Sequence, residues 1–101
     1  MYSFMYFMTN KHNTTLYIGV TRNLEKRVWK HKEGIAEYNF TKKYKCNKLV
    51  YYEVFGDIRY AIAREKQLKN WKREWKNKLV EKENPEWNEL SINSGDCGSS
   101  P

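Results

Sequence analysis

One carboxylate falls where a helix of this sequence would otherwise carry apolar side chains. Glu65 is four residues after Ala61 and three before Leu68, so a helix places it on their apolar face. A carboxylate buried there without a partner costs several kcal/mol. Two interpretations are open: Glu65 lies at the edge of the face and pairs with a lysine, or it binds a metal ion in a cleft.

Two further pairs of residues have types and spacings that could serve chemistry. Arg27 and His31 are four residues apart and share one face of a helix. Tyr6 and Tyr17 lie in two apolar runs on either side of a polar segment, as on adjacent strands of a hairpin. A solvated basic face and a packing pair are the ordinary outcomes. If the helix packs on the hairpin, Arg27 and His31 approach the tyrosines.

The strands that would position the tyrosines are visible in the apolar pattern. Aromatic and apolar runs cover 2–9 and 15–20, and the polar segment 10–14 between them predicts a hairpin. Gly19 marks the predicted end of the second strand. A third strand is predicted over 49–55, where β-branched and aromatic residues are concentrated.

The first predicted helix, over 22–33, would carry Arg27 and His31. Thr21 is its predicted N-cap, and Gly34 is predicted to stop it. Residues 35–46 are predicted to be irregular or a short helix. The apolar side chains of this first helix at helical spacing are Leu24, Val28 and Trp29.

The second predicted helix, over 58–71, would carry Glu65, and Asp57 is its predicted N-cap. A last helix is predicted over 74–83, ending before Pro85. The predicted apolar stripe of the second helix is Ile58, Ala61, Ile62, Leu68 and Trp71.

The element order β-β-α-β-α-α predicts an α+β domain with a small three-stranded antiparallel sheet flanked by helices. We expect this domain to cover 1–90 and the polar segment 91–101 to be a disordered tail. The apolar run over 1–8 is too short for a membrane span and lacks the marks of a signal peptide. Cys46 and Cys97 fit neither a metal-ligand spacing nor a disulfide framework, which favours the cytoplasm.

The charge of the chain favours an anionic partner. Nineteen Lys and Arg residues face twelve Asp and Glu residues, so the net charge is +7. Nucleic acid is favoured over an anionic membrane, and the 16% of aromatic residues could stack on bases as well as fill a core. The cations predicted to grip a nucleic-acid backbone are Lys42, Lys43, Lys45, Lys48, Lys66, Lys69, Lys72 and Arg73.

With these residues in place, the sequence resembles the GIY-YIG nuclease family. The second motif is intact as Tyr17-Ile18-Gly19, whereas the first reads Phe4-Met5-Tyr6 and keeps only its tyrosine. Arg27, eight residues after the motif glycine, stands where the family has its catalytic arginine, and His31 stands where the family has Tyr or His. Glu65 matches the metal-binding glutamate of the family.

The family's late asparagine has two possible matches. Asn77, twelve residues after Glu65, is preferred over Asn84. The chain looks most like the short stand-alone bacterial branch, and it is similar to the nuclease domain of the bacterial excision-repair subunit. That subunit has a lysine where this chain has Val20. Four runs carry the likeness to the branch: 16–21, 40–44, 61–69 and 84–87.

The resemblance implies a metal-dependent endonuclease, in which Glu65 binds Mg²⁺ or Mn²⁺ and Arg27 binds the phosphate. It implies that Tyr6 activates water and that Tyr17 orients the water or the phosphate. His31 is expected to titrate with an unperturbed pKa near 6.5. A monomer that cuts DNA rather than RNA, in repair or recombination and without sequence specificity, is expected.

Two alternatives remain open. The missing Gly-Ile of the first motif and Val20 would also suit a nucleic-acid-binding module that has weak or no catalysis. An adaptor that binds a repair or ribosomal protein through its aromatic surface is the other.

Overall fold

A three-stranded antiparallel sheet in the order β2-β1-β3 lies at the centre of the computed structural model, which describes residues 2–33 and 45–91. The central strand β1 (Ser3–Thr9) pairs with β2 (Leu16–Thr21) on one side and with β3 (Lys48–Phe55) on the other. Among the described residues, β2 and β3 are therefore the two edges of the sheet. The predicted hairpin, third strand and α+β class are confirmed.

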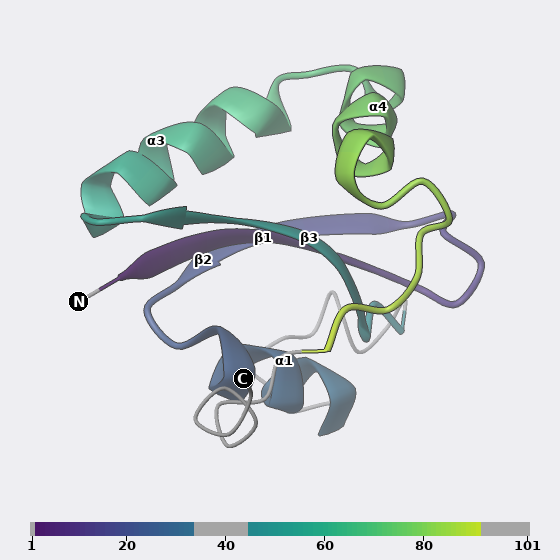
Figure 1. The fold of residues 1–101 in the computed structure, drawn as a ribbon, viewed down its shortest axis with the longest axis horizontal. Helices are drawn as coiled ribbons and strands as arrows, with labels where there is room; N and C mark the ends of the chain where they lie inside the picture. The colour runs from purple at the N-terminus through teal and green to yellow at the C-terminus, as the bar shows by residue number, and fades with distance from the viewer. Residues whose placement is uncertain (1, 34–44, 92–101) are drawn as a thin grey trace.

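Helices cover both faces of this sheet. α1 (Leu24–Glu33) lies on one face, and α3 (Ile58–Lys69) and α4 (Arg73–Glu83) lie on the other (Figure 1). The element order β-β-α-β-α-α is the predicted one. Within the described part of the chain, no helix combines the length and the apolar character needed to cross a membrane.

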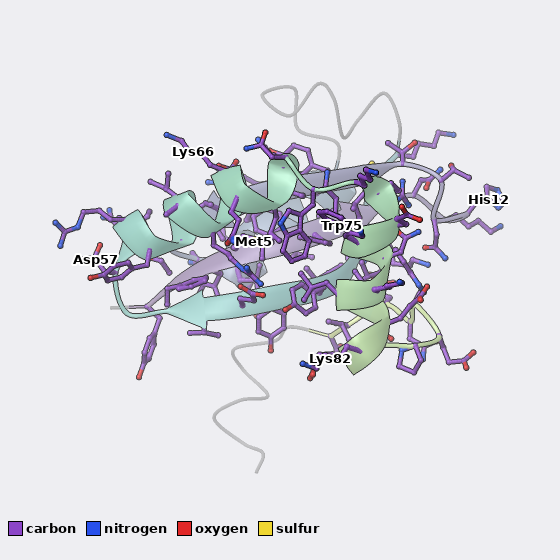
Figure 2. All side chains as sticks on the ribbon, turned by 90° about the horizontal axis from the view of Figure 1, so that it is seen from above. Met5, His12, Asp57, Lys66, Trp75 and Lys82 are labelled. Atoms are coloured by element: carbon purple, nitrogen blue, oxygen red, sulfur yellow. The ribbon has the colours of Figure 1, made fainter. Side chains whose placement is uncertain are left out.

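The alternation of side chains along β1 supplies both layers of the core. Tyr6 and Met8 are fully buried on the α1 face, where they pack with Leu24 and Val28. Met5 and Phe7, which alternate with these residues, face the other way. Figure 2, seen from the side of α3 and α4, shows Met5 beneath these helices. Other buried residues of this second layer are Ile18, Val50, Leu68 and Val80.

The N-cap of α1 differs from the prediction. Thr21 is the last residue of β2, and its hydroxyl group accepts a hydrogen bond from the backbone N–H of Asn23. Asn23 caps the helix instead, because its Oδ1 accepts the N–H of Lys26 at 3.0 Å. The predicted Thr21 cap is wrong, since Thr21 is still paired with Phe4 in the sheet.

The second long helix ends earlier than predicted. α3 stops at Lys69 with Asn70 as its C-cap, so Trp71 lies beyond the helix and packs against the core. The Asp57 N-cap is confirmed by a 2.8 Å hydrogen bond from the N–H of Arg59. The limits of α4 agree with the prediction to within one residue.

Some predictions fall on residues that the structure does not describe. These are the helix stop at Gly34, most of segment 35–46, the cations Lys42 and Lys43, and residues 92–101 of the predicted tail.

Candidate active site at the edge of the sheet

The buried face of α1 includes a histidine. Leu24, Val28 and His31 recur at helical spacing and are 3%, 7% and 3% exposed. The predicted place of Trp29 on this stripe is wrong, because its side chain is 55% exposed. His31 therefore packs against the sheet instead of belonging to a solvated basic face.

His31 contacts the tyrosines of both motifs. The Tyr6 hydroxyl oxygen and His31 Nε2 are 3.0 Å apart, in a buried hydrogen bond. The centroid of the His31 ring is 5.7 Å from that of Tyr6 and 5.2 Å from that of Tyr17. The predicted approach of His31 to the hairpin tyrosines is confirmed, and rings from β1, β2 and α1 meet at one point.

The environment keeps His31 neutral. Burial, together with the positive charge of nearby Arg27, lowers the pKa of His31 to about 4 from its usual 6.5. The expected unperturbed pKa was wrong because the sequence does not reveal this burial. A neutral ring accepts the phenol proton of Tyr6 at Nε2 in the tautomer that carries its own proton on Nδ1.

Gly19 makes room for the Tyr6 hydroxyl group. The two residues are partners in the β1–β2 pairing. A Cβ atom at position 19 would lie 2.5 Å from Tyr6 Oη and 3.0 Å from Tyr17 Cε2. The prediction that Gly19 ends the strand is wrong, since β2 continues to Thr21. The glycine of the Tyr-Ile-Gly motif is required because the catalytic candidates crowd its α-carbon.

Arg27 lines a basic cavity where β2 meets α1. The cavity has a volume of about 370 Å³, and its wall includes Val20 at the end of β2. Position 20 itself carries no charge, but the surrounding wall does. The cations that line this cavity are Arg22, Lys26, Arg27 and Lys30.

Glu65 belongs to the buried stripe of α3. Ala61 and Leu68, four residues before and three after it, are 0% exposed, whereas Ile62, predicted for the stripe, is 38% exposed. The Glu65 side chain is 19% exposed, and its Oε2 pairs with Lys69 Nζ at 2.9 Å. Glu65 therefore pairs with a lysine, as the first of the two interpretations of its sequence position predicted.

Glu65 and His31 approach the hairpin from opposite faces of the sheet, since α1 and α3 lie on different sides (Figure 1). Residues of the edge strand β2 contact both of these sides of the sheet. Lys69, the partner of Glu65, lines a second cavity of about 330 Å³ together with Tyr17. The structure thus brings Tyr6, Tyr17 and His31 into direct contact and places the Glu65–Lys69 pair across β2 from them.

The two asparagines have different surroundings. Asn84 is buried and structural: its Nδ2 donates to the carbonyl groups of Val50 and Asn88, and its Oδ1 accepts the N–H of Asn88. Asn77 is partly exposed on α4 and accepts a hydrogen bond from Arg73 Nε at 2.8 Å. The geometry favours Asn77 over Asn84 as the residue available to a substrate.

The predicted backbone-gripping cations are dispersed. Lys45, Lys66, Lys69 and Lys72 are exposed, and Lys48 is partly buried. Arg73 differs from them, because its guanidinium donates to the carbonyl groups of Asn13 at 2.7 Å and Thr14 at 3.1 Å. It fastens α4 to the β1–β2 loop.

Four cations that line the two cavities were not predicted from the sequence: Arg22, Lys26, Lys30 and Lys76. A signal for the first three exists, because residues 22, 26 and 30 are spaced four apart and therefore follow one helical face. Lys76 gives no such signal, since only the packing of α4 brings it to β2.

Within the described residues, fold and site define a small α+β protein that presents tyrosines and cationic cavities along the β2 edge of its sheet. The sequence model of the GIY-YIG catalytic domain matches residues 2–79, and the chain belongs to the GIY-YIG family. Its catalytic domain is therefore of the nuclease type, which acts on nucleic acid.

Short bacterial proteins of the same kind are similar to this chain. A UPF0213 protein of Syntrophus aciditrophicus is 39% identical over 72 residues, which cover 71% of this chain and 82% of that protein. A UPF0213 protein of Clostridium perfringens is 36% identical over 78 residues, covering 77% and 82%. The solution NMR structure of a UPF0213 protein from Bacillus halodurans has the same fold, with a TM-score of 0.53, 23% identity and coverage of 92% and 100%.

Proposed function

We propose that this chain is a metal-dependent endonuclease that hydrolyses phosphodiester bonds in nucleic acid. The observation that carries the proposal is the buried hydrogen bond between Tyr6 and a neutral His31, beside Arg27 and next to the edge strand β2. Phosphodiester hydrolysis needs a positioned water and fixed positive charge for the transition state. The cluster of Tyr6, Tyr17 and His31 offers groups that can position a water. The basic cavity at Arg27 offers the fixed positive charge.

The donor chemistry of Glu65 fits a hard divalent cation. Its carboxylate is mostly buried and already pairs with the ammonium group of Lys69. Among the described residues, no three His, Cys, Asp or Glu side chains gather into a metal cluster. Mg²⁺ or Mn²⁺ held by one carboxylate takes its other ligands from waters and phosphate oxygens. A bound ion would supply Lewis-acid stabilisation of the phosphate charge.

Tyr6 and His31 would orient the attacking water. In the His31 tautomer that carries its proton on Nδ1, the Tyr6 hydroxyl group donates the hydrogen bond to Nε2, and a lone pair of its oxygen can then accept a hydrogen bond from water. A histidine with a pKa of about 4 holds a proton poorly at neutral pH, so His31 positions the hydroxyl group and is not itself the general base. The water loses its proton to solvent as its oxygen bonds to phosphorus.

Arg27 would stabilise the charge that builds up on the phosphate. A guanidinium can bind two phosphate oxygens at once and stays charged at every working pH. As the new bond to phosphorus forms, the bond to the leaving oxygen breaks, and that oxygen takes up a proton from solvent. Tyr17, in ring contact with His31, would orient the scissile phosphate between the Arg27 guanidinium and the water held by Tyr6.

The degenerate first motif leaves this arrangement intact. Met5 is fully buried in the α3 layer. Phe4 packs edge-on against Tyr52, with 6.2 Å between the ring centroids. Both altered residues therefore serve packing, while Tyr6 keeps the contact with His31. The lysine missing at Val20 is offset by the cations of α1 around the same cavity. These observations favour an active enzyme over a binding module without catalysis.

We propose DNA as the substrate and a monomer as the active form, in repair or recombination. Contacts from lysine and arginine to phosphate give affinity without reading sequence. The described domain offers no helix that is separate from the catalytic fold and could read a groove. Cutting is therefore expected to depend on the structure of the substrate more than on its sequence.

The test is a nuclease assay of the full chain on duplex, flap, branched and single-stranded DNA and on RNA. We expect cleavage with Mg²⁺ or Mn²⁺, none with EDTA, and none by Glu65→Gln, which keeps the shape of the side chain but removes its charge. Glu86→Gln, at an exposed position, is the matched control and should cut normally. Binding without cleavage in every arm would instead support the inactive binding module.

A further inference from the structure

A second cation-lined cavity lies on the opposite face of β2 from α1. Leu16, Tyr17 and Ile18 form its β2 wall, and Lys69 and Lys76 form the other. Three consecutive strand residues line it, and β2 is an edge strand among the described residues, so the cavity follows that edge of the sheet. An edge strand leaves backbone N–H and C=O groups without a strand partner. The cavity therefore offers the ammonium groups of Lys69 and Lys76 beside the outer edge of β2.

Lys76 is the distinctive residue of this cavity. Its ammonium group forms no hydrogen bond or ion pair with any residue between 2 and 33 or 45 and 91, although the side chain is partly buried. Burial and the positive charges of Arg73 and Lys69 lower the pKa of Lys76. Three cations are gathered here, and the carboxylate of Glu65 pairs with only one of them, Lys69.

The fold holds Lys76 in place. Arg73 binds the carbonyl oxygens of Asn13 and Thr14 and is also bound to Asn77, which fixes the first turn of α4 against the hairpin loop. Lys76 follows Arg73 by three residues and so lies on the same side of α4. A like-charged group held close to other cations costs free energy unless an anion joins them.

We propose that Lys76 and Lys69, with the edge of β2, form a phosphate subsite that binds the nucleic-acid backbone next to the scissile phosphate. Tyr17 is common to this cavity and to the ring cluster with His31, which places the subsite beside the reacting group. The inference deepens the proposed function and rests on it for the choice of nucleic acid as the source of the phosphate.

The subsite also predicts the path of the nucleic-acid backbone across the protein. The cavity at Arg27 lies against residues 20 and 21 of β2, and the subsite lies against residues 16 to 18. Strand residues rise about 3.3 Å each, so the two cavities are roughly 10 Å apart along the edge. A backbone that follows β2 would place one phosphate in each cavity, and the scissile bond would pass Tyr17.

The experiment measures binding of a short DNA duplex to the full chain without divalent metal, as a function of salt. Lys76→Gln should lower the magnitude of the slope of log K against log salt by about 0.9, the value for one lost phosphate contact. Lys76→Arg, which keeps the charge, should retain the slope. Lys82→Gln is the control, because Lys82 is exposed at the other end of α4 (Figure 2) and should change nothing.

A second measurement identifies the ligand. In NMR titrations, the amide signals of Leu16, Tyr17 and Ile18 should shift with the duplex in the wild type and in Lys82→Gln, and the shifts should be smaller in Lys76→Gln. Shifts with inorganic phosphate alone, and none with the duplex, would overturn the nucleic-acid subsite in favour of a small-anion site. Equal slopes for Lys76→Gln and Lys82→Gln would overturn the subsite itself.

These outcomes separate the subsite from the proposed function. A protein that binds DNA through Lys76 but never cuts it would refute the endonuclease and keep the subsite. A protein that cuts DNA while Lys76→Gln binds and cuts like the control would keep the endonuclease and refute the subsite. Thermal unfolding of each variant checks that the fold is retained.

Discussion

The hydroxyl oxygen of Tyr6 lies so close to Gly19 that a Cβ atom on the glycine would be 2.5 Å from it. The hydroxyl group also bonds to His31, so it cannot move away without losing that partner. One atom of β1 is therefore confined between a residue of β2 and a residue of α1. This confinement fixes the orientation of the proposed water-positioning group.

Gly19→Ala should therefore damage activity more than its small size implies. The methyl group must displace the Tyr6 ring, so we expect a loss of stability on the order of 1–3 kcal/mol from overpacking. Cleavage should fall by on the order of 10²-fold or more. Gly56→Ala is the control, since nothing lies within 4 Å of a Cβ there. Wild-type turnover in Gly19→Ala would show that the Tyr6 position is not catalytic.

Arg27→Ala should lower turnover by on the order of 10²-fold at every pH, because it removes a fixed positive charge from the proposed transition-state site. Arg27→Lys should recover only part of the rate, since an ammonium lacks the planar fork. Lys78→Ala, an exposed substitution on α4, should cut like the wild type. An unchanged rate in Arg27→Ala would remove it from the site.

The stability of the protein should depend on His31 at acid pH. Its pKa falls from 6.5 in an unfolded chain to about 4 in the folded one, so the unfolded state binds the proton more readily. The contribution of the neutral His31 to the free energy of unfolding is complete above pH 6.5 and is lost as the pH falls toward 4. We expect the wild type to lose on the order of 2–3 kcal/mol more than His31→Gln over this range.

Chemical denaturation at several pH values measures this difference. His12→Gln, at an exposed position of the β1–β2 loop, should retain the wild-type pH dependence. In addition, Arg27→Ala should raise the pKa of His31 in NMR titrations, because the arginine charge is one of the two causes of the lowered pKa. Parallel pH curves for the His31 and His12 variants would show that the burial of His31 carries no electrostatic cost.

Binding to duplex DNA should weaken steeply with salt. Among the described residues, six cations line the two cavities, and four to six phosphate contacts correspond to a slope of log K against log salt of about −4 to −5. Replacing Arg22, Lys26 and Lys30 by Gln should reduce the magnitude of the slope by about 2–3. The double variant Lys78→Gln, Lys82→Gln, on exposed positions of α4, should leave it unchanged. A slope near zero in the wild type excludes a grip on the backbone.

The sequence by itself determined the elements and the residues that each could present. Alternation and helical spacing depend on local backbone geometry, so they predicted the hairpin that pairs the strands of Tyr6 and Tyr17. The same spacing put Glu65 on the stripe of Ala61 and Leu68, where the structure has it. These features require only neighbouring residues and their periodicity.

Only the tertiary structure decided which faces meet. Helical spacing allowed either Trp29 or His31 to turn inward, and packing on β1 selected His31, 25 residues away from its partner Tyr6. The pKa of His31, the need for glycine at position 19 and the approach of Lys76 to β2 all follow from such long-range contacts. A local pattern specifies a face of one element, but the neighbour that buries this face comes from a distant part of the chain, and burial sets the charge state and the space available there.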